Sequence, residues 1–112
     1  MPNEKFLGEF ELIVLGALMR LSDQAYGVAI IEEIDKRTGR DVSVGALYST
    51  LNRLEKKGYV QARMGEASAV RGGRAKRFFE VTTDGRVQVE RSSLALHNMM
   101  QGLPAWAKGA KA

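Results

Sequence analysis

The sequence lacks cysteine altogether and contains a single histidine. Without cysteine there is no disulfide, no thiolate nucleophile and no cysteine-ligated metal, and the composition is compatible with a reducing compartment. The lone histidine, together with the absence of a convergent pair of carboxylates, argues against an acid–base active site. We therefore expect no enzymatic activity, no metal and no cofactor.

Long apolar runs are also missing. The longest apolar stretch, residues 12–21, is too short to span a bilayer. The first residues, MPNEKFLGEFE, carry acids where a signal peptide needs a cationic and then an apolar segment. At 112 residues and 45% hydrophobic content, the chain has room for one domain with a modest core. We expect a one-domain cytoplasmic protein.

The positive charge is concentrated in one block of the sequence. The net charge of +4 is only mildly basic, but residues 53–77 hold 8 of the 17 lysines and arginines and only 2 of the 13 acidic residues. Residues 1–52 are acidic on balance. Such a block is typical of a surface that faces phosphates. No G-x-x-x-x-G-K-[ST] motif occurs in the chain, so nucleotide hydrolysis is not supported.

Residues 42–58 are predicted to form a short helix with two unlike faces. Ser43 suits the N-cap, and Gly58 suits the left-handed residue that follows a helix. At about 100° per residue, three leucines form an apolar stripe: Leu47, Leu51 and Leu54. The opposite side carries small, amide-bearing and cationic residues: Gly45, Ser49, Asn52, Arg53 and Lys56. This face suits nucleic acid, because Asn pairs with adenine and Arg or Lys with guanine. On this stretch alone, an ordinary surface helix is the alternative interpretation.

Two further helices are predicted before this one. Residues 8–21 repeat apolar side chains at a helical period, and a second helix runs from about residue 26 to residue 38, where Gly39 ends it. The brief connection that follows gives a helix-turn-helix arrangement, with residues 43–57 in the recognition position. The acidic residues at 32–35 point in different directions on their helix and are assigned to a solvated face.

After Gly58 the apolar period changes to two, which predicts strands at residues 59–64 and 76–82. Together they make a hairpin with a long, Gly-bearing loop, or wing. The cations of its second half are Arg71, Arg74, Lys76 and Arg77. The loop is either a solvated hairpin tip or a basic arm that follows the DNA backbone or enters the minor groove.

A last helix is predicted from a cap at Thr82 or Thr83 to about Gln101, before Gly102 and Pro104. Its apolar stripe consists of Val89, Leu96, Met99, Met100 and Leu103, with Trp106 beyond. Such a stripe in a small domain indicates core or oligomer interface, and we predict a dimer seam. The alternative is a pocket lined by methionine, with Trp106 stacked on a flat ligand.

The order of these elements resembles the PadR family of bacterial transcriptional regulators. The resemblance covers about residues 7–86 and is carried by short motifs in each element. These are Leu15-Gly16-Ala17-Leu18; Tyr26-Gly27; Gly45-Ala46-Leu47-Tyr48 with Leu51, Leu54-Glu55 and Gly58; Gly72-Gly73-Arg74; and Phe78-Phe79-x-Val81-Thr82 with Gly85. The most specific piece is the L-Y-x-x-L-x-x-L-E-x-x-G run followed by the basic G-G-R and the aromatic strand.

The resemblance implies a mainly α fold with a small β-hairpin (α+β), a winged helix-turn-helix that acts as a homodimer. Family members are usually repressors that bind palindromic operators in double-stranded DNA, and small aromatic or cationic compounds release some of them. We assign residues 1–82 to the DNA-binding domain and 83–112 to a dimerisation helix and tail. The rival function is a winged-helix module that binds protein instead of DNA.

The predicted DNA contacts comprise the recognition helix and the wing: Ser43, Gly45, Tyr48, Ser49, Asn52, Arg53, Lys56, Arg71, Arg74, Lys76 and Arg77. Asn52 and Arg53 are expected to read bases, whereas the wing cations hold the backbone. Tyr48 borders the apolar face, so it is assigned to the core, to a phosphate contact or to both. The predicted dimer interface is the stripe of the last helix with Trp106.

Overall fold

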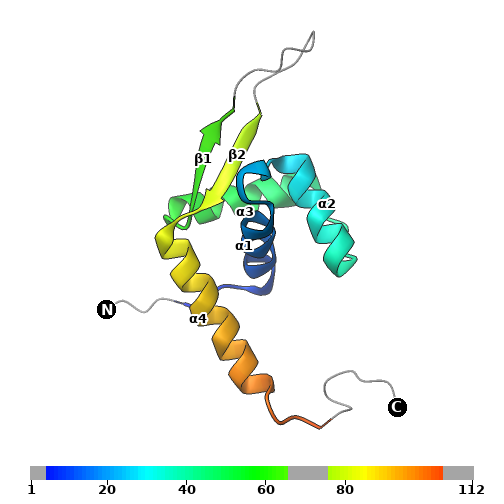
Figure 1. Cartoon of the computed structure of the whole chain (residues 1–112), viewed down its shortest axis with the longest axis vertical. Coiled ribbons are helices and arrows are strands. Elements are labelled where there is room, and N and C mark those ends of the chain that lie inside the picture. Colours follow the sequence, from blue (N-terminus) through cyan, green and yellow to red (C-terminus); the bar gives the residue numbers. More distant parts are fainter. Residues whose placement is uncertain (1–4, 66–75, 105–112) are drawn as a thin grey trace.

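The computed structural model describes residues 5–65 and 76–104. Their elements follow in the order α1 (Glu9–Leu21), η1 (Ser22–Gln24), α2 (Gly27–Thr38), α3 (Val44–Lys56), β1 (Val60–Met64), β2 (Arg77–Val81) and α4 (Thr83–Met100). The predicted fold, mainly α with one small hairpin, is confirmed (Figure 1). The predicted bounds of the elements agree with the structure to within one or two residues.

Local hydrogen bonds and left-handed glycines set the ends of the helices. Ser43 Oγ accepts a hydrogen bond from the backbone N–H of Ala46 at 3.1 Å, which confirms the predicted cap of α3. Gly39 and Gly58, which follow α2 and α3, have φ angles of 73° and 84°. Residues that carry a side chain rarely adopt these backbone angles, so glycine suits both positions, and both glycines end their helices as predicted. Thr82 caps α4 in the same way as Ser43 caps α3.

The core lies where α1, α2, α3 and the hairpin meet. Leu47, Leu51 and Leu54 of α3 are each 0% exposed, so the predicted apolar stripe is confirmed. Phe79 of β2 is among the largest buried side chains of this core. Burying a leucine contributes about 1.5 to 3 kcal/mol. The stripe therefore fixes which side of α3 faces solvent.

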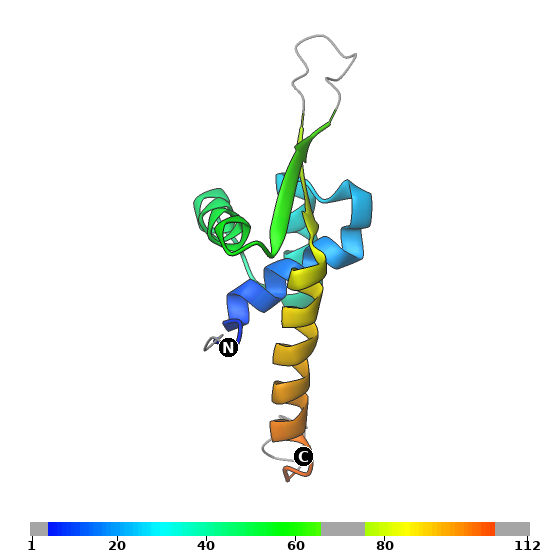
Figure 2. The same cartoon turned by 90° about the vertical axis from the view of Figure 1, so that its left-hand side faces the viewer.

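The hairpin is anchored at its base and leaves the body of the protein at its far end. β1 and β2 pair antiparallel from Val60 opposite Val81 to Met64 opposite Arg77. Near the base, the N–H of Phe79 donates to the carbonyl of Ala25 at 2.9 Å. The far end projects beyond the helices (Figures 1 and 2), and Met64 is 62% exposed. Met64 therefore lies outside the core, although the period-two pattern of β1 places it on the same side as Val60.

Helix α4 starts under the hairpin and runs to the opposite end of the molecule (Figures 1 and 2). Its first turn packs closely on the chain before β1, because a Cβ at Gly85 would lie 2.2 Å from the carbonyl oxygen of Tyr59. Farther along, Ser92 Oγ accepts from the N–H of Leu7 at 3.0 Å, so the segment before α1 lies against α4. None of the helices that the structure describes has the length and apolar character needed to cross a membrane.

Candidate nucleic-acid interface

Four residues form an exposed row along the side of α3 that faces away from the core. The row, called here the outer row, consists of Gly45, Ser49, Asn52 and Lys56, all exposed. Their spacing of four, three and four residues keeps them on one face of a helix. Within the described residues, the side chains of Ser49, Asn52 and Lys56 make no hydrogen bond or ion pair. The outer row thus presents hydrogen-bonding groups and one cation to solvent. Ser43 is exposed at the helix start, where its hydroxyl serves as the cap.

Arg53 lies on one flank of α3 and is tied to helix α1. Its Nε–H donates to Glu11 Oε2 at 3.2 Å, and the Nζ of Lys57 lies 3.1 Å from the same oxygen. Glu11 Oε1 accepts from the N–H of Gly8 at 3.0 Å. Two cations, one on α3 and one at its C-cap, therefore share one carboxylate of α1. Asn52 and Arg53 are both predicted to read bases, but Asn52 is exposed to solvent, whereas Arg53 contacts Glu11 on α1.

The carboxyl group of Glu11 is largely buried, with 11% of its side chain exposed. Burial by itself raises the pKa of this group, whereas the hydrogen bonds from Gly8, Lys57 and Arg53 lower it. The hydrogen bonds prevail, and the pKa lies below its ordinary value of 4.5. Glu11 is thus ionised at neutral pH and compensates the positive charge beside it. Glu11 was not among the residues predicted from the sequence, where its only local signal is its place three residues after the cap Gly8.

The other flank of α3 packs on the hairpin. Tyr48 is half-buried, and its ring meets that of Phe79 edge to face with centroids 5.9 Å apart. Glu55 Oε1 accepts from a guanidinium nitrogen of Arg77 at 3.2 Å. These contacts place part of Tyr48 in the core, as one of its alternatives predicted, and they tie the hairpin to the second half of α3. A phosphate contact by Tyr48 stays a prediction.

The cations of the hairpin divide between its two faces. Arg77 is on the face toward α3. The Nζ of Lys76 lies 4.0 Å from the ring centroid of Tyr26, and the guanidinium of Arg63 lies 4.7 Å from that of Phe78. Arg63 is exposed and stands inside the basic block of residues 53–77, but it is not among the DNA contacts predicted from the sequence. The predicted contacts Arg71 and Arg74 lie outside the described residues.

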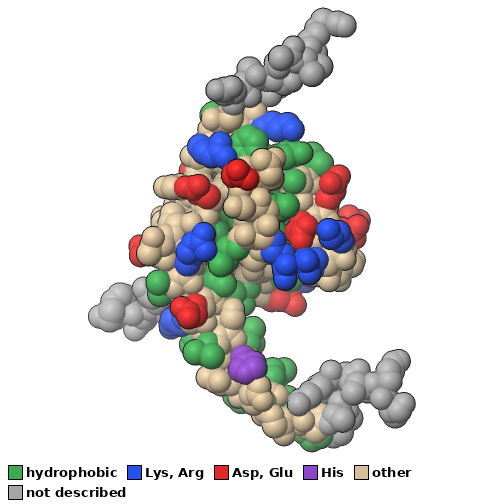
Figure 3. Space-filling view, viewed as in Figure 1, with side chains coloured by type: hydrophobic (Ala, Val, Ile, Leu, Met, Phe, Trp, Pro, Cys, Tyr) green, Lys and Arg blue, Asp and Glu red, His purple; other side chains and the backbone are tan. Residues whose placement is uncertain are grey.

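Exposed apolar side chains accumulate on the second half of α4 (Figure 3). A groove of about 490 Å³ runs between α1 and α4, and its apolar walls include Leu12, Ile13, Val89, Leu96 and Met100. Three predicted interface residues, Val89, Leu96 and Met100, thus meet in one groove. Met99 is 75% exposed and does not line it, and Leu103 is half-buried. Trp106 lies outside the described residues.

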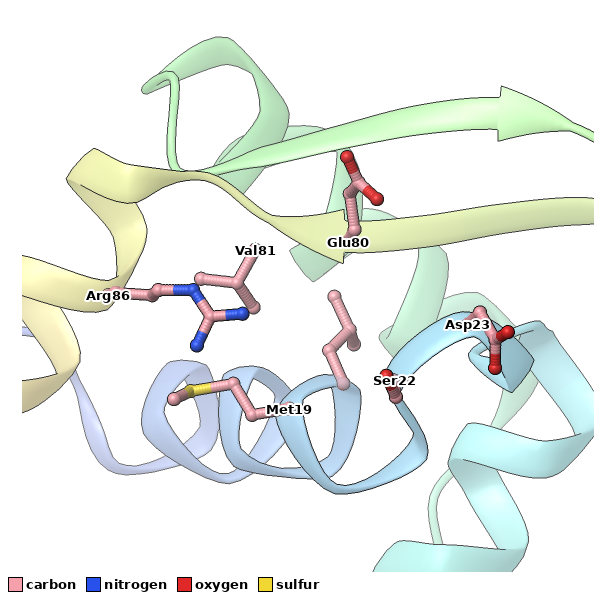
Figure 4. Close-up of a pocket in the computed structure, with 7 residues that line it drawn as sticks. Met19, Ser22, Asp23, Glu80, Val81 and Arg86 are labelled. Carbon is pink, nitrogen blue, oxygen red and sulfur yellow. The ribbon is translucent and has the colours of Figure 1, made fainter.

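A second cleft, of about 250 Å³, opens between α1, β2 and the start of α4. In Figure 4 the guanidinium of Arg86 extends toward Met19 and Val81, the carboxylate of Glu80 points toward β1, and Asp23 lies at the far end. This mixture of charges distinguishes the cleft from a phosphate-facing surface. Across the described ranges, no three His, Asp or Glu side chains gather in a way that could hold a metal ion.

Comparisons with known proteins agree with this geometry. A family model described as "Transcriptional regulator PadR-like family" matches residues 14–91. Among solved structures, a PadR family transcription regulator from hypervirulent Clostridium difficile R20291 has a TM-score of 0.70 at 22% identity, over 82% of this chain and 91% of that chain. None of the curated proteins compared with the chain matches it.

Two further structures show the same arrangement of elements. A transcriptional regulator from Clostridium thermocellum has a TM-score of 0.67 at 24% identity, over 80% of this chain and 81% of that chain. The structure entitled "F93 from STIV, a winged-helix DNA-binding protein" has a TM-score of 0.68 at 19% identity, over 89% of this chain and 100% of that chain. At these identities the likeness shows the fold, that of a winged helix.

Proposed function

Because the chain belongs to the transcriptional regulator PadR-like family, we propose that it is a sequence-specific repressor that binds a palindromic operator as a homodimer in the cytoplasm. The observation that carries this proposal is the outer row of α3, exposed and without partners among the described residues, beside a basic hairpin. A helix with such a face can enter the major groove and approach base edges closely.

Each part of the surface has a proposed task. Asn52 lies in the outer row, where its amide can pair with an adenine, and Lys56 can reach guanine or phosphate. Lys76 and Arg77, with Arg71 and Arg74 of the loop, hold the backbone. The base-reading role of Arg53 stays a prediction, and it requires the guanidinium to leave Glu11.

The dimer is proposed to form along the groove between α1 and α4, whose exposed apolar walls need cover. We accordingly assign residues 83–112 to dimerisation and residues 1–82 to DNA binding. A two-fold dimer places its recognition helices about one DNA turn apart, near 34 Å. Release by a small aromatic or cationic compound stays a prediction, because Trp106, which would stack on a flat ligand in the alternative interpretation, lies outside the described residues.

Selection of genomic fragments by the purified protein tests the proposal. We expect enrichment of an inverted repeat whose half-sites are centred about 10 base pairs apart, since each half-site meets one recognition helix. Sequencing of the bound fragments after successive rounds, with a parallel selection lacking protein, gives the measurement. If no sequence is enriched and no duplex is retained, the result would support the rival function, a winged-helix module that binds protein.

Replacing Asn52 by alanine should cost about 1 to 3 kcal/mol of operator affinity and relax the preference at one base position. The comparison variant Lys76→Ala should weaken binding to all sequences alike, because a phosphate contact carries no base information. Binding titrations against a set of single-base operator variants measure both effects. Uniform loss from both substitutions would contradict the proposed division of tasks.

A further inference from the structure

Glu11, Arg53 and Lys57 form a compact group, called here the Glu11 cluster. Arg53 and Lys57 belong to the last turn of α3 and its C-cap, and both bind Glu11 Oε2, at 3.2 and 3.1 Å. The other oxygen of Glu11 is occupied by the N–H of Gly8. A single carboxylate on α1 thus restrains two cations that the sequence assigns to the recognition helix.

The two cations remain close to solvent while they are restrained. The side chains of Arg53 and Lys57 are 50% and 44% exposed, against 11% for Glu11. Because the carboxylate is sheltered and ionised, its attraction is screened less than that of a surface ion pair. Without Glu11, both cations would be available to nearby phosphates. The outer row of α3 does not include either residue, so its base-reading groups stay in place whether or not the cluster is intact.

We propose that Glu11 is a specificity-determining residue that keeps Arg53 and Lys57 from binding the phosphates of unrelated DNA. The inference rests on the proposed function of DNA binding. Non-specific affinity comes almost wholly from cations that neutralise phosphates, whereas discrimination comes from base contacts. Restraining two cations per protomer therefore lowers non-specific binding more than it lowers operator binding, and the ratio between the two rises.

The variant Glu11→Gln tests this inference. Glutamine keeps the size of the side chain and can still accept from Gly8, as in a capping box, but it carries no charge. We expect tighter binding to an unrelated duplex at 50 mM salt and a smaller ratio of operator to unrelated affinity. Each cation that reaches a phosphate steepens the salt slope by about 0.9. If one or two cations on each protomer of a dimer reach phosphate, the loss of affinity for the unrelated duplex between 50 and 200 mM salt should be about 12- to 150-fold larger in Glu11→Gln than in the wild type.

Glu33 on α2 provides a matched control. It binds Arg37 at 2.8 Å and Lys36 at 3.9 Å, so Glu33→Gln removes the same charge and also frees two cations. Glu33 and Arg37 line a small pocket against α1, together with Ile13 and Arg20, and none of the residues that line it belongs to α3. We expect Glu33→Gln to keep the wild-type salt slope. Equal steepening in both variants would mean that net charge alone is responsible and would overturn the inference.

Lys57→Gln gives a second test, and its measurement in the wild-type background does not depend on the folding of Glu11→Gln. In the wild-type background we expect no change in slope, because Lys57 is already held by Glu11, whereas in the Glu11→Gln background it should remove about half of the added steepness. A flatter slope in the wild-type background would show that Lys57 already binds phosphate and would refute the inference. An unchanged salt slope in folded Glu11→Gln, or an increased ratio of operator to unrelated affinity, would also refute the inference. If the wild-type protein binds no duplex in these titrations, the proposed function fails instead.

Discussion

Raising the salt concentration from 50 to 200 mM should weaken operator binding about 10³- to 10⁵-fold. This result follows if the dimer neutralises about 6 to 10 phosphates, because each neutralised phosphate releases condensed counterions. To the proposed phosphate contacts each protomer brings the exposed cations Lys56, Lys76 and Arg77, and the sequence of the loop adds Arg71 and Arg74. Anisotropy titrations of a labelled operator duplex at several salt concentrations give the slope directly.

Substitutions of single lysines identify the surface responsible for this slope. Lys76→Gln removes one wing cation per protomer, and for two copies the slope should become shallower by about 1.8. Lys36→Gln is the control: it also removes one lysine charge, from a side chain on α2 that is 72% exposed, and should leave the slope unchanged. Binding that does not respond to salt would instead support the winged-helix module that binds protein.

Helix α3 could be predicted in detail because its signals are local. Ser43 meets the N–H that it caps three residues later, and Gly58 needs only its own backbone angle to end the helix. The spacing of Leu47, Leu51 and Leu54 defines the buried side without knowledge of what covers it. For such features, the interacting groups lie within one or two turns of each other in the sequence.

The position of Arg53 could not be predicted in the same way. A helical wheel places it about 80° from Gly45, on the polar side of α3. Its partner Glu11 is 42 residues away, on a helix whose packing angle no local pattern gives. The sequence therefore grouped Arg53 with Asn52, whereas the structure pairs it with α1. Contacts between distant elements decide which polar residues of a helix are available to a partner.

The two faces of the wing also depend on contacts between distant elements. From the sequence, the cations near its end belong together, in either a solvated hairpin tip or a basic arm, although neighbouring residues in a strand point to opposite faces. Lys76 lies over Tyr26, whereas Arg77 faces Glu55 on α3. The alternation was visible in the sequence, but the face that adjoins the recognition helix became evident only with the register of β1 and β2.

Replacing Leu96 by aspartate should turn the proposed dimer into a folded monomer. Leu96 is 56% exposed in the protomer and lines the groove between α1 and α4, so the substitution leaves the core of the winged helix intact. Two copies of a lost leucine contact cost the dimer about 3 to 6 kcal/mol, or about 10²- to 10⁴-fold in its dissociation constant. Sedimentation gives the oligomeric state, and circular dichroism reports the fold.

Operator binding by Leu96→Asp should weaken by a similar factor, about 10²- to 10⁴-fold, because two linked recognition helices bind the half-sites far more tightly than separate ones. Leu94→Asp is the matched control, because it makes the same change on the same helix. Leu94 is 54% exposed, lies about 200° from Leu96 around the helix axis and does not line the groove. This control should remain dimeric and bind the operator as the wild type does. If Leu94→Asp dissociates the dimer while Leu96→Asp does not, the interface lies on the other side of α4. If Leu96→Asp unfolds the chain, the stripe belongs to the core of one protomer.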